Sequence, residues 1–257
     1  MDPAGTITVI TGASRGIGAA TARAMSRAGA RVGLVARSKD ELDDVLASCG
    51  GNGVAVGADV GDRTSIEEAL ARIERELGPI DILINNAGIG AYAPVVETDA
   101  EEFERMMRVN YLGTVYALKA IVPGMIERGR GHIVSVASIA GRIGAPLEAG
   151  YSASKFAMIG LTEALSLELA RKKIGVSVVD PGPVTTSFFD TRGVPFQRSR
   201  PKPSTPEQVA DVIVDAIRKE RAEVFIPKWL RYAWMIRVLM PGAYRRGTLN
   251  EFGDELR

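Results

Sequence analysis

Short apolar, β-branched segments alternate with helical segments along most of the chain. The apolar segments predict strands at Thr6–Thr11, Arg31–Ala36, Gly53–Ala58, Ile80–Asn85, His132–Ala137, Gly175–Val179 and Glu223–Ile226. The segments between them predict a helix ending at Ala28 and further helices at Glu41–Ala47, Ser65–Leu77, Ala100–Glu127, Ala153–Ala170 and Pro206–Arg218. Strands this apolar are covered on both faces, as in a parallel sheet. The pattern therefore predicts an α/β fold with a doubly wound parallel sheet of about seven strands and helices on both faces.

The chain of 257 residues fits one such domain. We expect that domain to span residues 1–228, with a substrate loop at about 185–205, and to be followed by a C-terminal extension over 229–257. The stretch Gly193–Pro206 is rich in Pro, Ser and Arg. We interpret it as a loop within the domain, because a helix and a strand of the same sheet follow it.

Composition narrows the possible partners and compartment. The formal net charge is +1, which does not favour binding to nucleic acid. The single cysteine, Cys49, allows no disulfide within the chain and is consistent with the reducing cytoplasm. The N-terminus lacks the basic and apolar regions of a secretory signal, and no stretch reaches the roughly 18 apolar residues of a membrane-spanning helix. We expect a cytoplasmic protein.

A glycine-rich turn follows the first predicted strand and opens a helix. It reads Thr11-Gly12-Ala13-Ser14-Arg15-Gly16-Ile17-Gly18. Glycines there let backbone amides approach a pyrophosphate, and the helix N-terminus adds partial positive charge. We therefore predict a dinucleotide site of the Rossmann type. The residues expected to contact the cofactor are Gly12, Ser14, Arg15, Gly16, Ile17 and Gly18.

The end of the second strand indicates which dinucleotide binds. A site for NAD has an acidic residue there for the ribose 2′-hydroxyl, whereas this chain has Ala36 and then Arg37. Arg37 and Arg15 can both pair with a 2′-phosphate through charge-assisted hydrogen bonds. We predict that the cofactor is NADP(H). The alternative is that Arg37 is a solvated surface charge.

Tyr151 and Lys155 are the candidate chemical groups. Four residues separate them in a predicted helix, so both project from one side. A nearby ammonium lowers the pKa of a phenol and makes it a better acid–base catalyst. Ser138 follows the fifth strand, at the sheet edge where ligands bind, and its hydroxyl can hydrogen-bond a substrate oxygen beside the phenol.

With these motifs the chain resembles the short-chain dehydrogenase/reductase family, from about Thr6 to Ile226. The matching motifs occur in the family's order: Thr11-Gly12-x-x-x-Gly16-Ile17-Gly18, Asp59-Val60, Asn85-Asn86-Ala87-Gly88, Asn110, Ser138, Tyr151-Ser152-Ala153-Ser154-Lys155 and Pro181-Gly182. The resemblance implies that Tyr151 exchanges a proton with a carbonyl or alcohol oxygen while the cofactor carries the hydride. It also implies a homodimer or homotetramer built on the long helices before and after the fifth strand.

The resemblance further implies roles for individual residues. Asp59 holds the adenine with the Val60 backbone beside it, and Asn86, Ala87 and Gly88 line the adenine-ribose side. Lys155 also binds the nicotinamide ribose, and Asn110 holds a water that connects Lys155 to solvent. The nicotinamide carboxamide is expected to be bound by Pro181, Gly182, Val184 and Thr186.

The C-terminal extension departs from the plainest members of this family. Residues 228–246 are mostly apolar and include both tryptophans and several basic residues. Such a segment either packs over the substrate pocket or a neighbouring subunit, or lies on a membrane surface as an interfacial helix. Either interpretation favours an apolar, lipid- or steroid-like substrate. Phe188, Phe189 and Phe196, in the loop expected to close over the substrate, support the same class.

The sequence thus predicts an NADP(H)-dependent oxidoreductase that reduces a ketone or aldehyde, or oxidises the alcohol. The alternative is a regulatory or scaffold protein that binds NADP on the same fold without catalysis. The four residues Asn110, Ser138, Tyr151 and Lys155 argue against that alternative, because a non-catalytic chain has no physical need for all of them. No metal is assigned, because the only histidine, His132, has no accompanying ligands in the sequence.

Overall fold

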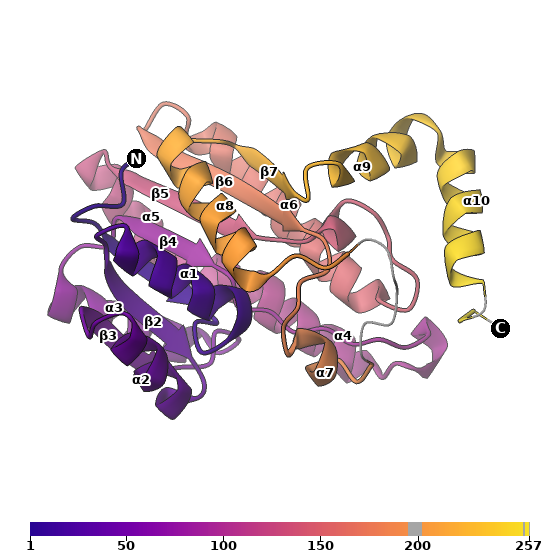
Figure 1. Ribbon diagram of the computed structural model, residues 1–257. Coiled ribbons are helices and arrows are strands. Elements are labelled where there is room, and N and C mark those ends of the chain that lie inside the picture. Colours follow the sequence, from indigo (N-terminus) through magenta and orange to yellow (C-terminus); the bar gives the residue numbers. More distant parts are fainter. Residues whose placement is uncertain (195–201, 254, 257) are drawn as a thin grey trace.

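Seven parallel strands form the central sheet of the computed structural model, which describes residues 1–194, 202–253 and 255–256 (Figure 1). The strands are β1 (Ile7–Thr11), β2 (Arg31–Ala36), β3 (Gly53–Gly57), β4 (Ile82–Asn85), β5 (Gly131–Val136), β6 (Ile174–Pro181) and β7 (Glu223–Ile226). Their order is β3-β2-β1-β4-β5-β6-β7, and every neighbouring pair is parallel. The predicted α/β fold is confirmed, with strand bounds that shift by up to two residues.

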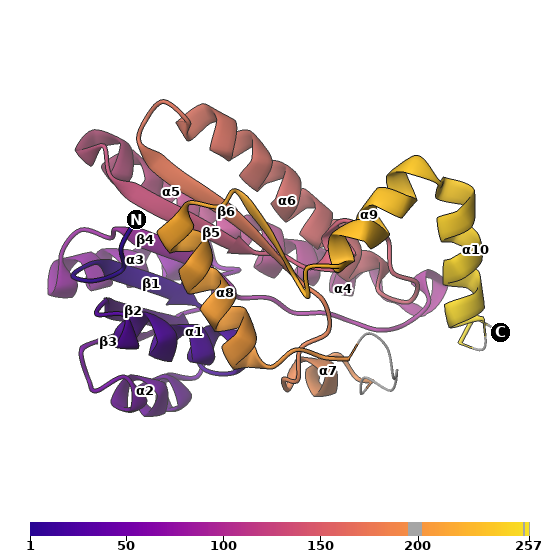
Figure 2. The same ribbon diagram turned by 45° about the horizontal axis from the view of Figure 1, so that its top comes forward.

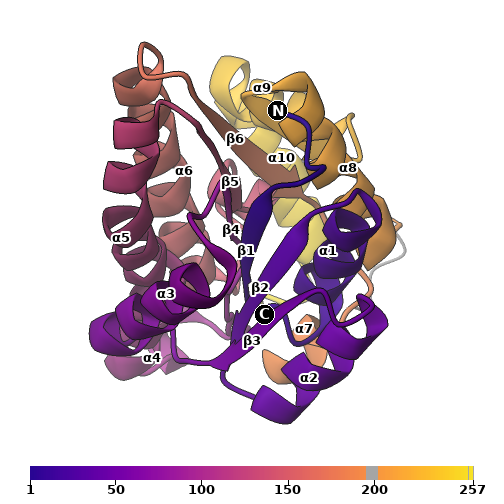
Figure 3. The same ribbon diagram turned by 90° about the vertical axis from the view of Figure 1, so that its left-hand side faces the viewer.

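Helices cover both faces of the sheet (Figure 3). One face holds α1 (Gly16–Arg27), α2 (Lys39–Ser48) and α8 (Pro206–Lys219), and the other holds α3 (Arg63–Leu77), α5 (Gly113–Arg128) and α6 (Ala149–Leu169). Shorter elements lie at the carboxyl edge: η1 (Val95–Glu97), α4 (Ala100–Met106), η2 (Met107–Leu112), η3 (Ile139–Gly141) and α7 (Phe188–Thr191). The helices thus bury both faces of the sheet, which is what the apolar strands require.

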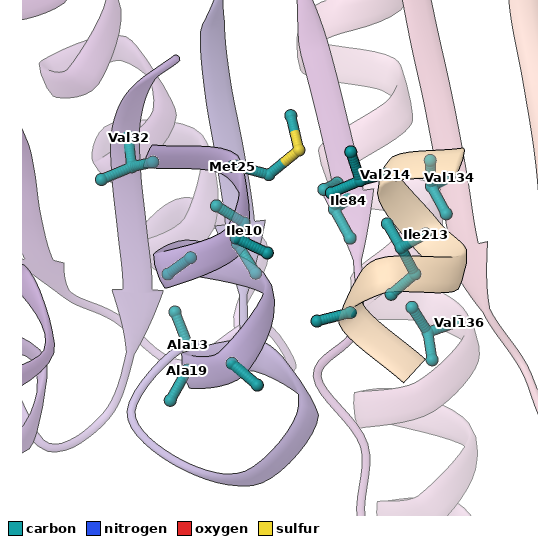
Figure 4. Close-up of a cluster of buried hydrophobic side chains, with 14 of the residues drawn as sticks. Ile10, Ala13, Ala19, Met25, Val32, Ile84, Val134, Val136, Ile213 and Val214 are labelled. Atoms are coloured by element: carbon teal, nitrogen blue, oxygen red, sulfur yellow. The ribbon is translucent and has the colours of Figure 1, made fainter. Parts of the chain in front are cut away.

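Close packing between the sheet and α1 and α8 builds one of the two main cores (Figure 4). Ile10 of β1 and Val134 of β5 are fully buried there, together with Met25 of α1 and Ile213 of α8. Burying one such side chain contributes about 1.5–3 kcal/mol. The same contacts fix the position of the α1 N-terminus, where the glycine-rich turn ends.

One helix departs from the predicted pattern. Residues Ala100–Glu127 were expected to form a single helix, and the structure interrupts it with a π-helical turn, η2, that contains Asn110. By length and mean hydropathy (1.2) the stretch Ala100–Arg128 would suffice to cross a membrane. Ala117, Ile121 and Met125 are buried against the sheet, so its apolar side forms part of the core. Single π-turns of this kind occur frequently at functional sites.

The C-terminal extension consists of two helices, α9 (Leu230–Leu239) and α10 (Pro241–Phe252). They lie at the end of the molecule farthest from α1 and α2 (Figures 1 and 2). The predicted substrate loop is described up to Val194 and again from Lys202, and it includes α7. Phe196 lies outside the described residues.

The only histidine makes stability dependent on pH. His132 is buried, with its Nε2 2.9 Å from Ser177 Oγ, and burial lowers its pKa from 6.5 to about 4. As the pH falls, His132 is therefore protonated in the unfolded chain before it is protonated in the folded chain. The contribution of the neutral His132 to stability is complete above pH 6.5 and is lost as the pH falls toward about 4. At about pH 5 the loss is about 2 kcal/mol.

The free energy of unfolding in urea can be measured at about pH 7 and about pH 5 for the wild type and for His132→Gln. We expect its fall between these pH values to be larger in the wild type by about 2 kcal/mol. The comparison of the two proteins cancels all other titrating groups. An equal fall in both proteins would show that His132 makes no such contribution.

Candidate active site

The glycine-rich turn lies directly against the loop that follows β4. Gly12 has φ +65°, and a Cβ there would lie 2.7 Å from Ala87 Cα. A Cβ on Gly18 would lie 2.1 Å from the Gly12 carbonyl oxygen. Both positions therefore require glycine for close approach, which is the constraint expected of a turn that brings backbone amides to a phosphate.

Side chains of Thr11 and Asn86 hold this turn in place. Thr11 Oγ1 accepts hydrogen bonds from Asn86 N (3.0 Å) and Ala87 N (3.1 Å). Asn86 Nδ2 donates to the carbonyl oxygens of Thr11 (2.9 Å) and Gly12 (3.2 Å). Asn86 thus holds the glycine-rich turn in place. The sequence predicted only that Asn86 lines the adenine-ribose side.

Two arginines lie at the end of the cavity predicted to hold the adenine. Arg15 and Arg37 are both exposed and line it, and among the described residues neither forms an ion pair. Ser38 begins α2 without using its side chain as a cap, and it lines the same region. Asp59 lines the cavity too, and its Oδ1 accepts a hydrogen bond from Gly61 N (2.8 Å). This end therefore offers two cations, a hydroxyl and a carboxylate to a ligand.

Tyr151 lies in the first turn of α6, beside Ser138, the residue that caps η3. The phenyl ring of Phe188 packs on it, with ring centroids 5.3 Å apart. Burial raises the pKa of the Tyr151 phenol to about 12, and the hydrogen bond with Ser138 opposes that rise. The phenol is therefore protonated at neutral pH.

Lys155 is buried one turn further along α6. Its Nζ donates to the carbonyl oxygen of Val136 (2.9 Å) and lies 5.8 Å from the Tyr151 ring centroid, over the ring. Burial lowers the pKa of Lys155 to about 8, while the Asp180 carboxylate raises it. A net lowering of the Tyr151 pKa by Lys155, as expected from the sequence, is not seen, because burial of the phenol dominates.

Asn110 is fully buried behind this pair. Its Oδ1 accepts from Ile89 N (2.8 Å), and its Nδ2 donates to Ile89 O (2.9 Å) and to Ser154 Oγ (2.8 Å). A Cβ on Gly88 would lie 3.4 Å from Asn110 Oδ1 and 3.5 Å from Lys155 Nζ, so the two side chains flank the same glycine. Asn110 is therefore close to Lys155, and the water that it was expected to hold stays a prediction.

The turn after β6 lies on the side of the cavity predicted to hold the nicotinamide. Val184 pairs with Ser204 in an isolated bridge, and Ser204 N donates to Pro183 O (2.9 Å). A Cβ on Gly182 would lie 2.7 Å from Leu230 Cδ1, so helix α9 packs directly on this turn. The extension thus contacts the predicted nicotinamide site.

A cavity of about 1040 Å³ joins all these groups. It is lined by every predicted site residue except Gly18 and Asn110, which lie directly behind its wall. Such a volume is at the upper end for small-molecule sites. The glycine-rich turn at one end, two cations beside it and a tyrosine at the other end fit an extended dinucleotide together with a substrate. Among the described residues, His, Cys, Asp and Glu form no group of three or more that could hold a metal.

Part of the substrate side was not found from the sequence. The cavity is lined by Trp229, which precedes α9, by Leu230 and Ala233 of α9, and by Tyr244 of α10. Tyr244 Oη donates to Gly144 O (3.0 Å). Gly90 is in contact with Phe188, since a Cβ there would lie 2.7 Å from Phe188 Cζ. The apolar composition of the extension signalled that it covers something, but not which residues face inward.

The fold and this site define a nicotinamide dinucleotide-dependent oxidoreductase. Residues 6–193 match the model of the short chain dehydrogenase family, to which the chain belongs. A relative in Drosophila melanogaster, dehydrogenase/reductase SDR family protein 7-like, is 33% identical over 255 residues, covering 93% of this chain and 78% of that protein. The glycine betaine reductase ATRR of Emericella nidulans is 38% identical over 227 residues, covering 84% of this chain but only 18% of that protein.

A solved structure shares the architecture. The 3-ketoacyl-(acyl-carrier-protein) reductase from Brucella melitensis, complexed with NADH, superposes with a TM-score of 0.81. It is 28% identical, and the alignment covers 87% of this chain and 96% of that one. The single-domain parallel sheet predicted from the sequence is therefore an arrangement that solved proteins adopt.

Proposed function

We propose that this protein is an NADP(H)-dependent reductase of an apolar ketone or aldehyde, working in reverse on the alcohol. The observation that supports it most is the convergence of Ser138, Tyr151 and Lys155 at the cavity that also contains the glycine-rich turn. A dinucleotide site alone would serve a regulator equally well. The protonated phenol beside a serine hydroxyl, at the substrate end, is what carbonyl chemistry needs.

Each side chain has one task in this reaction. The bound cofactor supplies hydride to the carbonyl carbon. Ser138 and Tyr151 donate hydrogen bonds to the carbonyl oxygen and so stabilise the negative charge that develops there. Tyr151 then gives its proton to that oxygen, which completes the alcohol. The Lys155 ammonium stabilises the phenolate until a proton returns from solvent.

The choice of NADP(H) rests on Arg15 and Arg37. The end of β2 holds no acid for a ribose 2′-hydroxyl, and both guanidiniums are exposed in the cavity. Two cations near one dianionic 2′-phosphate form charge-assisted hydrogen bonds. The Brucella reductase is complexed with NADH, so membership of the family does not by itself determine the choice.

The substrate end of the cavity favours an apolar molecule. Phe188, Phe189, Ile143, Trp229 and Leu230 all line it. Burial of apolar surface among them stabilises a bound ligand by roughly 25 cal/mol per Å². Lipid- or steroid-like carbonyl compounds have the apolar area to use such a wall.

The outer face of the extension suits an anionic membrane surface. Val238, Leu239 and Met240 are more than half exposed. Tyr232 is 53% exposed and Trp229 is 50% exposed. Between residues 228 and 250 there are five basic residues and no acidic one. Each basic residue near anionic lipid contributes about 1 kcal/mol. The inner face of the extension packs on the cavity. Packing over the pocket and contact with a membrane, the two alternatives for this segment, therefore apply to its opposite sides.

The protein's assembly and compartment belong to the same proposal. A homodimer or homotetramer through α5 and α6 would cover the exposed side chains of Ile126 and Leu167 on those helices. Peripheral membrane contact through 228–246 is consistent with a cytoplasmic chain that meets the inner leaflet.

Replacing Tyr151 with Phe should lower kcat for ketone reduction by about 10²–10⁴-fold, because the proton donor is lost. The Kd for NADPH should stay unchanged, and Tyr116→Phe on α5 serves as the matched control. Stopped-flow and steady-state oxidation of NADPH measure both quantities. Retained turnover in Tyr151→Phe would refute the mechanism. Tight NADPH binding by the wild type with no turnover over a broad ketone and aldehyde panel would favour the non-catalytic alternative.

Replacing Arg37 with Ala should weaken NADPH binding by about 10- to 100-fold, because hydrogen bonds to a charged group are worth about 1.5–3 kcal/mol. NADH binding should not change, since NADH lacks the phosphate. Arg72→Ala, on the surface of α3, is the control. Titration calorimetry with both cofactors measures the effect, and equal losses for NADPH and NADH would disprove contact with the 2′-phosphate.

Vesicles of anionic lipid should bind the protein and shift its tryptophan emission to the blue, because Trp229, at the start of the extension, is half exposed. The double variant Val238→Ser/Leu239→Ser should lose binding, and added salt should weaken it. Val96→Ser, an exposed apolar position on η1, is the control. Absence of both co-sedimentation and an emission shift would exclude the membrane contact.

A further inference from the structure

A buried arginine behind the active site pairs with carboxylates from three elements. Arg142 follows Ser138 by four residues and ends η3, and its side chain is only 7% exposed. Its Nε donates to Asp180 Oδ2 (3.0 Å) and its Nη1 to Glu163 Oε1 (2.6 Å). Its Nη2 donates to Glu223 Oε1. One guanidinium thus contacts β6, α6 and β7.

Each of these carboxylates belongs to an element that positions part of the site. Glu163 follows Lys155 by eight residues on α6, so both lie on one side of that helix. Asp180 is fully buried and directly precedes Pro181, where the nicotinamide-side turn begins. Arg142 itself terminates the short loop that starts at Ser138. Arg142 is therefore linked to the Ser138 loop, to the helix that carries Tyr151 and Lys155, and to the turn predicted to hold the nicotinamide.

Helix α9 joins the same cluster. The Arg142 guanidinium lies over the Trp234 ring, 5.7 Å from its centroid, which is cation–π distance. On the same helix, Leu230 packs on Gly182. The helix that forms the substrate wall is thus attached both to the guanidinium and to the nicotinamide-side turn.

We propose that Arg142 is a positioning residue for the reaction, which holds the Ser138 loop, helix α6 and the Pro181–Gly182 turn at fixed separations and attaches helix α9 to them. The inference rests on the proposed function. Arg142 contacts no reacting atom and acts through Ser138, Lys155 and the turn.

Arginine is the side chain that this geometry requires. Its planar fork directs separate N–H groups at separate acceptors, and its flat face is free to stack on an indole. A lysine ammonium carries one charge at a point and has no flat face. A lysine would pair with Asp180 but would leave the other contacts of Arg142 unmade.

The cluster also reaches the active site electrostatically. Asp180 faces Arg142 from η3, Glu163 and Lys155 from α6, and Glu223 from β7. Burial raises the pKa of Asp180 itself to about 7, while Arg142 opposes that rise, so the carboxyl is mostly ionised only above that pH. In its ionised form Asp180 raises the pKa of Lys155, against the lowering by burial to about 8. Removing that charge lowers the pKa of Lys155 further, so the ammonium is lost at a lower pH.

Two conservative variants test the proposal. Arg142→Lys should lower kcat by about 10- to 100-fold, since small misplacements cost that much, and leave KM for NADPH nearly unchanged. Asp180→Asn keeps an acceptor for Arg142 Nε and removes the charge. It should shift the alkaline limb of the kcat/KM profile to lower pH, which a merely structural role would not do. Arg142→Met should accelerate amide exchange together in 138–143, 181–186 and 229–235.

The matched control is the Arg130–Asp81 ion pair (3.1 Å), at the opposite end of the strands. Arg130→Lys and Arg130→Met should change neither kcat nor the pH profile. Wild-type kcat in Arg142→Lys with an unshifted profile in Asp180→Asn would overturn the proposal, even if both variants lost thermal stability. A wild type without any turnover would refute the proposed function instead. The amide-exchange pattern would then decide the inference, with independent exchange of the three segments counting against it.

Discussion

The strand order reverses between β1 and β4, and the site depends on that reversal. The helix that follows β1 covers one face of the sheet and the helix that follows β4 covers the other, so the chain leaves these two strands in opposite directions. A crevice must open at their carboxyl ends. The contact of Gly12 with Ala87 closes its floor. Ser138 follows β5 and Pro181 ends β6, and the carboxyl ends of both strands lie at the same edge because every strand is parallel.

Burial determines the protonation states in this crevice more than proximity does. Tyr151 and Lys155 are adjacent on α6, yet burial raises the pKa of one to about 12 and lowers that of the other to about 8. Both shifts favour the neutral form, as desolvation always does. A neutral phenol is a proton donor, which is the state that reduction consumes. Oxidation of an alcohol instead requires the phenolate, so it needs an intact ammonium beside the ring. The charge on Lys155 therefore bears chiefly on the oxidative direction and on recovery after reduction.

Local patterns were enough to predict the sheet, because burial on both faces makes each strand mostly apolar. The dinucleotide turn was predictable for a related reason: Gly12 and Gly18 are required by close backbone approach, and the sequence cannot satisfy that need with another residue. The π-turn at Asn110 was not predictable, since a shifted hydrogen-bond register leaves the apolar periodicity of the surrounding helix unchanged. The bracing role of Asn86 was hidden as well, because its acceptors come from β1 and the turn after it.

Contacts between distant segments explain most of what the sequence concealed. Arg142 reaches Asp180 and Glu223, which lie 38 and 81 residues further along the chain. Neither carboxylate stands in a recognisable motif with the arginine. The cavity wall made by α9 depends on Leu230 meeting Gly182, and this contact exists only once β6 and β7 are paired. Such residues could be identified only by asking which buried charges need a partner, a question that requires the folded chain.

Helix α9 unites the two interpretations of the extension, because its two sides are both apolar. Leu230 and Trp234 face the protein. Leu230 contacts the turn at Gly182, and Trp234 lies under the Arg142 guanidinium. Val238 and Leu239 face outward and are 56% and 72% exposed. Packing within the chain explains the first set and leaves the second unexplained, since an exposed surface gains nothing from leucine. For the apolar substrate class proposed above, a helix that is apolar on both sides would let a poorly water-soluble molecule pass from the surroundings to the cavity without full hydration.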